Sequence, residues 1–439
     1  MATPRPLDHQ IWDIAWPAIL ANISIPLLGL VDTAILGHLE SGQYLAAVAL
    51  GSAILSFLYW GFNFLRMGTT GLVAKATGAG DDDRGLLILG QSCILAIAIA
   101  ILVVVAHPLW LTAGLYLMAP GSELAPITSS YVSIRIISAP AVLLTYACVG
   151  WFIGRQNTRW PMVIVVITNL TNIALDFLLI VGLKMNSDGA ALASVMAEYL
   201  GLGLAVYGIH SSIPPDSARL WPRLWNWSDL KRLLHTNRDL FVRTMCLLSG
   251  FAFFTAMGER LGTQVLAANA IMLQLLMLAA YGMDGIAYAA EALAGNRAGA
   301  GDLTGFYRVV RRCALWCAGL VLGITGFFLL SSQALFSLLT NIPDILALLE
   351  SYQWWLIALT LCAAPSYLLD GVFIGTAKTR YMMQSMLISM LFVYLPCWFW
   401  SRGLGNHGLW LSFTAFHIAR GATLQYWFWQ LSRTSAWSK

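Results

Sequence analysis

The sequence predicts an all-α polytopic membrane protein with twelve transmembrane helices in two six-helix lobes. Composition gives the first reason: of 439 residues, 59% are hydrophobic and only 10% are charged, against about 25% charged in ordinary soluble domains. So few charges cannot cover a water-soluble protein of this length, which excludes a cytosolic enzyme, a secreted disulfide scaffold and a disordered protein. The other two reasons are the spacing of the apolar runs and an internal repeat.

Twelve apolar runs follow one another along the chain. A span needs about 20 apolar residues, and in lipid each run must be helical because the solvent offers the backbone no hydrogen-bond partner. A polar stretch, 214–238, separates the sixth run from the seventh. In order, the predicted spans are 14–36, 45–68, 86–109, 126–153, 161–183, 189–213, 240–258, 266–294, 307–330, 345–374, 381–400 and 408–430.

The basic residues indicate the orientation of these spans. With the N-terminus in the cytoplasm, eighteen of the 25 lysines and arginines fall in inner loops or ends. Only Lys184, Arg260 and Arg402 fall outside, and four arginines lie within spans. The excess of positive charge on cytoplasmic loops predicts that both termini are cytoplasmic.

The chain repeats itself at an offset of 221 residues. Leu45–Leu50 falls on Leu266–Ile271, Gly78–Asp81 on Gly299–Asp302, and Phe152–Gly154 on Phe373–Gly375. The repeat unit holds six helices, an even number, so both halves enter the membrane in the same direction. This predicts a pseudo-two-fold axis along the membrane normal, with an N-terminal lobe at 1–213, a cytoplasmic linker at 214–238 and a C-terminal lobe at 239–439.

These paired stretches, together with the runs Asp284–Glu291 and Leu369–Gly375, resemble the multidrug and toxic compound extrusion (MATE) family. The last two runs resemble its DinF branch in particular, and the similarity covers essentially the whole chain. The resemblance implies a twelve-helix, two-lobe antiporter that expels organic compounds by using a proton or sodium gradient.

Acidic residues inside the spans are candidates for function, because a charge at the bilayer centre costs roughly 2.5–3.5 kcal/mol even on the lenient insertion scale. The repeat aligns none of them with an acid in the other half, so they are additions specific to one lobe. They are Asp32, Asp176, Glu198, Asp284, Glu291 and Asp370.

In the N-terminal lobe, Asp32 and Asp176 lie at one predicted depth, about 6–9 Å below the outer boundary. Asn169, Asn172 and Asp176 share one helix face, and Ser194 lies at a comparable depth. Two carboxyls so near each other cannot both ionise cheaply, which indicates a proton carrier. The set Asp32, Asn172, Asp176 and Ser194 resembles the family's N-lobe cation site, although the family often has threonine at the position of Ser194.

In the C-terminal lobe, one helix face carries Tyr281, Asp284, Tyr288 and Glu291, and the tenth span carries Asp370. Some branches of the family have an acidic site in the C-terminal lobe, and Asp370 resembles the acid that the family carries on its tenth helix. These residues therefore form a possible substrate or coupling site. The alternative is an internal network in which the acids pair with Arg243 or Arg420.

Other motifs have structural interpretations. The seven cysteines show no metal-ligand spacing and are expected to pack as small hydrophobic residues. The run Asp81–Arg84 resembles an acidic metal-binding motif but is expected to cap a helix N-terminus, and Glu198 is expected to pair with Arg135. We expect no cofactor and no metal centre, apart from Na⁺ at Asp32, Asn172 and Asp176.

The sequence thus predicts a secondary multidrug efflux antiporter for amphipathic, cationic or neutral organic compounds, driven by H⁺ or Na⁺. It is expected to be a monomer in the bacterial cytoplasmic membrane, with the lipid bilayer and small organic substrates as partners and no nucleic acid. One alternative is a flippase for lipid-linked precursors, which would need several cations to hold a pyrophosphate. The other is an intramembrane enzyme, for which no clustered catalytic motif is found.

Overall fold

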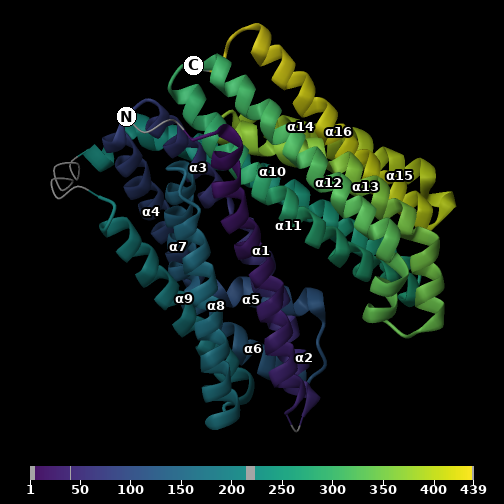
Figure 1. The fold of residues 1–439 in the computed structure, drawn as a ribbon. Helices are drawn as coiled ribbons and strands as arrows, with labels where there is room; N and C mark the ends of the chain where they lie inside the picture. Colours follow the sequence, from purple (N-terminus) through teal and green to yellow (C-terminus); the bar gives the residue numbers. More distant parts are fainter. Residues whose placement is uncertain (1–4, 40, 214–222, 438–439) are drawn as a thin grey trace. The chain divides into compact units, whose positions relative to one another are not determined.

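The computed structural model describes residues 5–39, 41–213 and 223–437, and every regular element among them is helical (Figure 1). Four short 3₁₀ or π-helical turns interrupt the longer helices. The α-helices are α1 (Leu7–Gly37), α2 (Gly42–Gly61), α3 (Phe64–Gly78), α4 (Asp82–Val105), α5 (His107–Met118), α6 (Leu124–Arg135), α7 (Ala139–Gly154), α8 (Arg159–Asp176), α9 (Asn186–His210), α10 (Trp227–Arg260), α11 (Thr263–Gly299), α12 (Leu303–Leu339), α13 (Pro343–Gly375), α14 (Thr379–Ile388), α15 (Leu395–Ser401) and α16 (Asn406–Arg433). The short turns are η1 (Ile136–Ser138), η2 (Phe177–Gly182), η4 (Ser389–Tyr394) and η5 (Arg402–Leu404).

Eleven helices within the described residues are long and apolar enough to cross a membrane. They correspond in order to the first eleven predicted spans. The twelfth predicted span lies in α16, which has 28 residues and is therefore about 42 Å long. It is not among the eleven, and it carries His417, Arg420 and Gln425 in its middle turns. The structure thus has an all-helical, polytopic membrane architecture with eleven clear spans.

The chain folds into two compact units. Unit 1 comprises Met1–Ile19, Ala74–Gly80 and His235–Lys439, and unit 2 comprises Leu20–Val73 and Asp81–Leu234. The division falls within α1 and within α3, so each of these helices has one end in unit 1 and the other end in unit 2. Residues 214–222 of the predicted linker lie outside the described residues, whereas the part after Trp227 is helical and continuous with α10. The division into lobes at 213 and 239 remains a prediction.

Helix boundaries reproduce the 221-residue repeat. The range 263–299 of α11 corresponds at this offset to 42–78, the range of α2 and α3 together. The range 303–339 of α12 corresponds to 82–118, the range of α4 and α5. One half therefore breaks a helix where the other keeps it whole, and Pro108 at the start of α5 explains one break, because proline cannot continue the backbone ladder.

The turns after α3 and α11 are also alike. Gly80 and Gly301 both have φ of 72°, a left-handed conformation that favours glycine. Asp81 then accepts a hydrogen bond from the N–H of Arg84 at 2.9 Å, and Asp302 accepts one from the N–H of Gly305 at 2.8 Å. The predicted cap at Asp81 is confirmed, and both turns begin the next helix in the same way.

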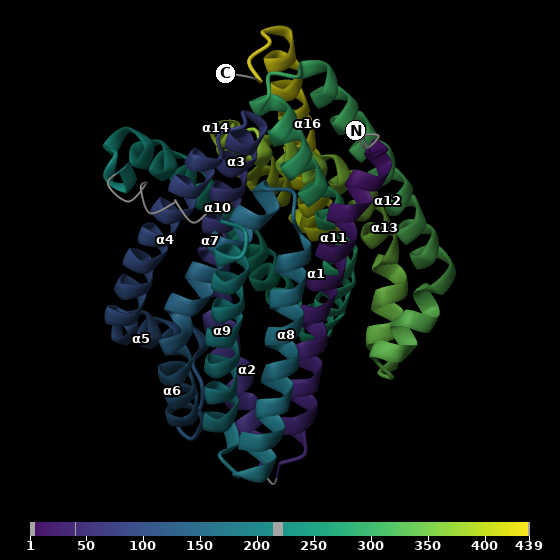
Figure 2. The same cartoon turned by 60° about the vertical axis from the view of Figure 1, so that its left-hand side comes forward.

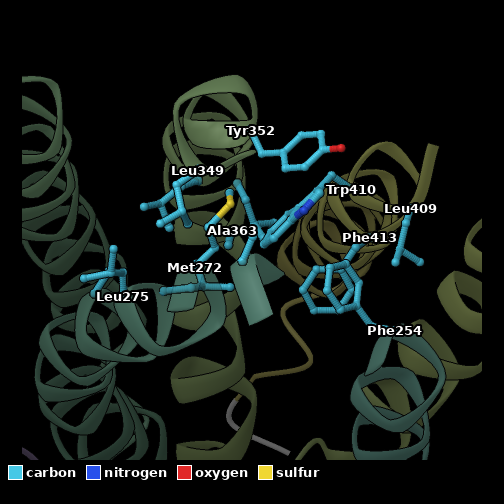
Figure 3. Packing of buried hydrophobic residues seen from close by; sticks show 14 of the residues in the cluster. Phe254, Met272, Leu275, Leu349, Tyr352, Ala363, Leu409, Trp410 and Phe413 are labelled. Atoms are coloured by element: carbon cyan, nitrogen blue, oxygen red, sulfur yellow. The ribbon is translucent and has the colours of Figure 1, made fainter. Parts of the chain in front are cut away.

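Each unit has its own apolar core. In unit 2, α8 and α9 run side by side (Figure 2), and buried residues of several helices, among them Leu36, Val132 and Ala191, form one cluster. In unit 1, aromatic rings of α10 and α16 pack edge to face. Phe254 lies 4.9 Å from Trp410 between ring centroids (Figure 3). These cores hold the helices that carry the candidate site residues.

Glycines allow the closest helix contacts in both halves. A Cβ added at Gly371 or Gly375 on α13 would collide with the carbonyls of Ala287 and Glu291 on α11. The equivalent glycines of α7, Gly150 and Gly154, approach α3 in the same way. Membrane helices associate through such small residues because lipid provides no hydrophobic driving force between them.

We predict that Gly375→Ala lowers the thermal stability of the protein in detergent. The added methyl must push α13 away from α11, and overpacking of this kind costs about 1–3 kcal/mol. Gly319→Ala on α12 is the matched control, because no atom lies within 4 Å of its added Cβ. Thermal unfolding followed by size-exclusion chromatography checks this, and equal unfolding temperatures for both variants would contradict the packing account.

Candidate functional site

The structure brings the four candidate residues of the first half together inside unit 2. Asp32 lies near the end of α1, Asn172 and Asp176 lie on the last turns of α8, and Ser194 lies on α9. Asp176 is 1% exposed and Asn172 is 2% exposed. The spacing i, i+4 places both α8 side chains on one face, which is directed at α1 and α9.

Asn172 links the second carboxyl to α9. When its amide is oriented to satisfy both neighbours, its nitrogen donates to Oδ2 of Asp176 at 3.0 Å. Its oxygen then accepts from the hydroxyl of Ser194 at 3.0 Å and from the backbone N–H of Ser194 at 3.1 Å. The Asn172 amide therefore holds Oδ2 of Asp176 in place and leaves Oδ1 of the same carboxyl available.

The carboxyls of Asp32 and Asp176 lie within hydrogen-bonding reach of each other. Each also has a buried Oδ1 atom with no hydrogen-bond partner among the described residues. An ionised carboxylate only accepts hydrogen bonds, so two facing carboxylates lack a donor between them. A proton shared by the pair, or a small cation coordinated by it, would satisfy both.

A second contact joins α1 to α8 two turns before the carboxyl pair. The Asn169 amide donates to the carbonyl of Ser24 at 3.2 Å and to its hydroxyl at 3.1 Å. Ser24 precedes Asp32 by eight residues, and Asn169 precedes Asp176 by seven, so the two helices run parallel and meet at two levels. The predicted helix face does include Asn169, but its partner Ser24 was not predicted.

A half-buried ion pair lies next to the carboxyls. Arg135 donates to Glu198 at 2.8 Å and to the Ser138 hydroxyl at 3.1 Å, which confirms the predicted pairing of Glu198. Arg135 is also close enough to interact electrostatically with both Asp32 and Asp176. Glu198 lies on α9 together with Ser194, whereas the position of Arg135 beside the carboxyls depends on how α6 packs in this unit and was not predicted.

A π-helical turn, η2, begins directly after Asp176. The second half has its own π-helical turn, η4, but at the 221-residue offset its start at Ser389 corresponds to Thr168 rather than to Phe177. Such turns are frequent at functional sites, since the wider turn shifts the side chains around it. No sequence signal identified this feature.

In unit 1, Asp370 makes the internal contacts that were the alternative interpretation. It accepts hydrogen bonds from Arg243 and from Arg420, the latter at 2.8 Å. Arg420 is only 2% exposed, so this is a buried ion-pair cluster joining α10, α13 and α16. The guanidinium groups of Arg243 and Arg420 thus bind the Asp370 carboxylate, which was expected as a possible coupling acid.

The other C-lobe candidates lie on α11. Tyr281, Asp284 and Tyr288 are half-buried, and Glu291 is buried. Tyr367 of α13 interacts electrostatically with both Asp284 and Asp370. The predicted polar face therefore adjoins the ion-pair cluster within unit 1.

Other candidate motifs match their structural interpretations. All seven cysteines are free and are buried or half-buried. Within the described ranges, no group of three or more histidine, cysteine or acidic side chains could hold a metal ion.

We predict that Asp370→Asn lowers the free energy of unfolding by about 3 kcal/mol, because removing one partner of a buried ion pair leaves uncompensated charge. Asp82→Asn, which breaks the more exposed pair with Arg155 at 3.2 Å, should cost no more than about 1 kcal/mol. Thermal unfolding of both purified variants measures the difference. A stable Asp370→Asn protein would show that the cluster does not hold these helices.

Comparison with known proteins agrees with this architecture. The MatE family signature matches residues 17–178 and 240–399, one match in each half. The chain is 37% identical over 424 residues to the DNA damage-inducible protein F of Escherichia coli strain K12, covering 95% of this chain and 91% of that protein. It is 24% identical over 441 residues to the probable multidrug resistance protein NorM of Thermotoga maritima, covering 94% and 90%.

A solved structure of a mutant of the Vibrio cholerae MATE transporter VcmN superposes with a TM-score of 0.86. The sequence identity is 19%, and the match covers 98% of this chain and 97% of that one; at this identity the likeness shows the fold. With a family match in both halves and a close relative over nearly its whole length, the chain belongs to the multidrug and toxic compound extrusion (MATE) family of membrane transporters, as a homologue of DNA damage-inducible protein F.

Proposed function

We propose that the protein is a secondary active antiporter that exports amphipathic, cationic or neutral organic compounds in exchange for H⁺ or Na⁺ by alternating access. The observation that carries this proposal is the pair Asp32 and Asp176. Two carboxyls face each other inside apolar helices, and each keeps a buried oxygen without a partner among the described residues. Such a pair would be stabilised by a cation that binds and is then released.

Both candidate ions suit this group of residues. A proton would turn one carboxyl into a donor to the other. Na⁺ prefers hard oxygen ligands, and the two carboxyls, the Asn172 amide and the Ser194 hydroxyl offer them. The inward movement of each positive charge is driven by about 2.3 kcal/mol per 100 mV of membrane potential.

Cation binding would act on α1. Neutralising Asp32 changes its contact with α8, while the Ser24–Asn169 contact continues to hold the two helices together two turns away. Pro17 and Pro26 interrupt the backbone ladder of α1, so the helix can change its bend at these points. This change in the packing of α1 would expel the cargo.

The charges within the spans support cationic or neutral cargo. A flippase for lipid-linked pyrophosphates would need free cations, but Arg135 is paired with Glu198, and Arg243 and Arg420 are paired with Asp370. Three of the four intramembrane arginines are thus ion-paired, and the two carboxylates offset two of their three positive charges. The geometry therefore favours the antiporter over the flippase.

The same proposal includes the topology. All twelve predicted spans, with α16 as the last, would cross the bilayer, and the two halves would be related by a pseudo-two-fold axis along the membrane normal. Both termini would lie in the cytoplasm and the protein would act as a monomer in a bacterial cytoplasmic membrane. The basic residues of the inner loops and the repeat visible in the helix bounds support this arrangement.

We predict that Asp32→Asn abolishes gradient-driven export while the protein stays folded. Asparagine mimics the neutral carboxyl permanently, so the site can neither bind nor release the cation. Export of a fluorescent organic cation from proteoliposomes, under an imposed pH or sodium gradient, measures the effect. The expected result is a loss of the gradient-dependent component.

The matched control is Asp13→Asn, the same chemical change on the same helix at an exposed ion pair with Arg5. It should export at the wild-type rate. Wild-type export by Asp32→Asn would refute the coupling role and transfer it to Asp284, Glu291 and Asp370.

A further inference from the structure

A cavity of about 550 Å³ lies within unit 1 between α12, α13 and α16. Helix α13 packs against both α12 and α16 in this unit (Figure 1). The walls are mainly aliphatic along α12 and α13, from Ala314 to Leu322 and from Leu361 to Leu369. A cavity of this size is in the range of small-molecule sites, which measure about 300–1,000 Å³.

Polar lining residues gather toward the start of α12. Tyr307, Arg311 and Gln425 line the cavity there, and Arg311 and Gln425 are exposed. The ring of Tyr307 packs edge to face on Phe428 at 6.3 Å between centroids, which fixes its position. The cavity therefore has an apolar body and one basic, hydrogen-bonding end.

Small side chains and a proline create the space. Ala314 and Ala318 on α12 face Ala364 on α13 across the cavity. Pro365 lies inside α13 and donates no hydrogen bond to the preceding turn. The α13 wall thus combines a small side chain with one missing backbone hydrogen bond.

The internal repeat shows that these features belong to the second half alone. At the 221-residue offset, Tyr307, Arg311 and Gln425 correspond to Leu86, Gly90 and Leu204. The polar end thus has no counterpart in the first half.

The residues that leave space are also replaced. Ala318 corresponds to Ile97, Ala364 to Leu143 and Pro365 to Leu144. A shared scaffold carries larger apolar residues at all three positions in one half. The cavity and its basic end are therefore joint additions to the other half, as expected of a site grafted onto a fold.

We propose that this cavity binds one acyl chain of an anionic phospholipid, with the lipid phosphate at Arg311. The distance along α12 from Arg311 to Leu322 is eleven residues, or about 16 Å, which suits an extended chain rather than a compact solute. Arg308, Arg311 and Arg312 cluster at this end of α12. Basic residues that flank membrane helices on the cytoplasmic side attract anionic headgroups, with about 1 kcal/mol from each.

Photo-cross-linking of the full-length protein tests the proposal. The probe is a phosphatidylglycerol with a diazirine in one acyl chain, and phosphatidylcholine with the same chains is the comparison. We expect labelled peptides from 311–322 and 361–369, with phosphatidylglycerol labelling them more strongly. Arg311→Gln should weaken phosphatidylglycerol labelling about fivefold and weaken phosphatidylcholine labelling less, because the choline cation offsets the charge of the same phosphate.

Two matched variants separate the cavity from the general lipid surface. Ala318→Trp fills the cavity and should abolish labelling there, whereas Leu315→Trp, an exposed position of α12 outside the lining, should not. Arg312→Gln, an exposed arginine outside the lining, controls for the lost charge. Equal labelling by both lipids, labelling spread evenly over exposed helix faces, or labelling unaffected by Ala318→Trp would each overturn the proposal.

Discussion

The absence of any hydrogen-bond partner in lipid is the constraint on which this structure depends. It forces the backbone into helices, and it applies equally to each polar side chain within them. The partners of each acid within the helices therefore indicate its role. Asp370 is held by two arginines and Glu198 by one, whereas Asp32 and Asp176 face each other. Arg135 interacts electrostatically with this last pair, but each of its carboxyls keeps an oxygen without a hydrogen-bond donor among the described residues.

A duplicated scaffold explains where the exceptional features lie. The two halves share helix bounds, left-handed turns, aspartate caps and glycine contacts. They differ in the acids, in the helix breaks and in the cavity beside α12 and α13. Shared features build the six-helix unit. The features proposed for coupling and for lipid binding are each found in one half only.

The repeat, the first eleven spans and the grouping of Asp32 with Asp176 could be predicted from the sequence, because apolar runs and helical spacing indicate them. The bridging amide of Asn172 also followed from its position on the Asp176 face. The partner Ser24 and the proximity of Arg135 could not be predicted, because they depend on how separate helices pack. The π-helical turn after Asp176 has no signal in the apolar periodicity, and the break before α5 depends on a single proline, Pro108.

The central claim is that Asp32 and Asp176 share one exchangeable cation. Difference infrared spectroscopy of the purified protein tests this most directly, because a protonated carboxyl in an apolar site has its own C=O stretching band. The account predicts a band that disappears when the proton is removed at high pH or replaced by Na⁺, and that is lost in both Asp32→Asn and Asp176→Asn. A band that persists unchanged in both variants would contradict this claim. So would a wild-type spectrum that shows no such band and does not change when Na⁺ is added.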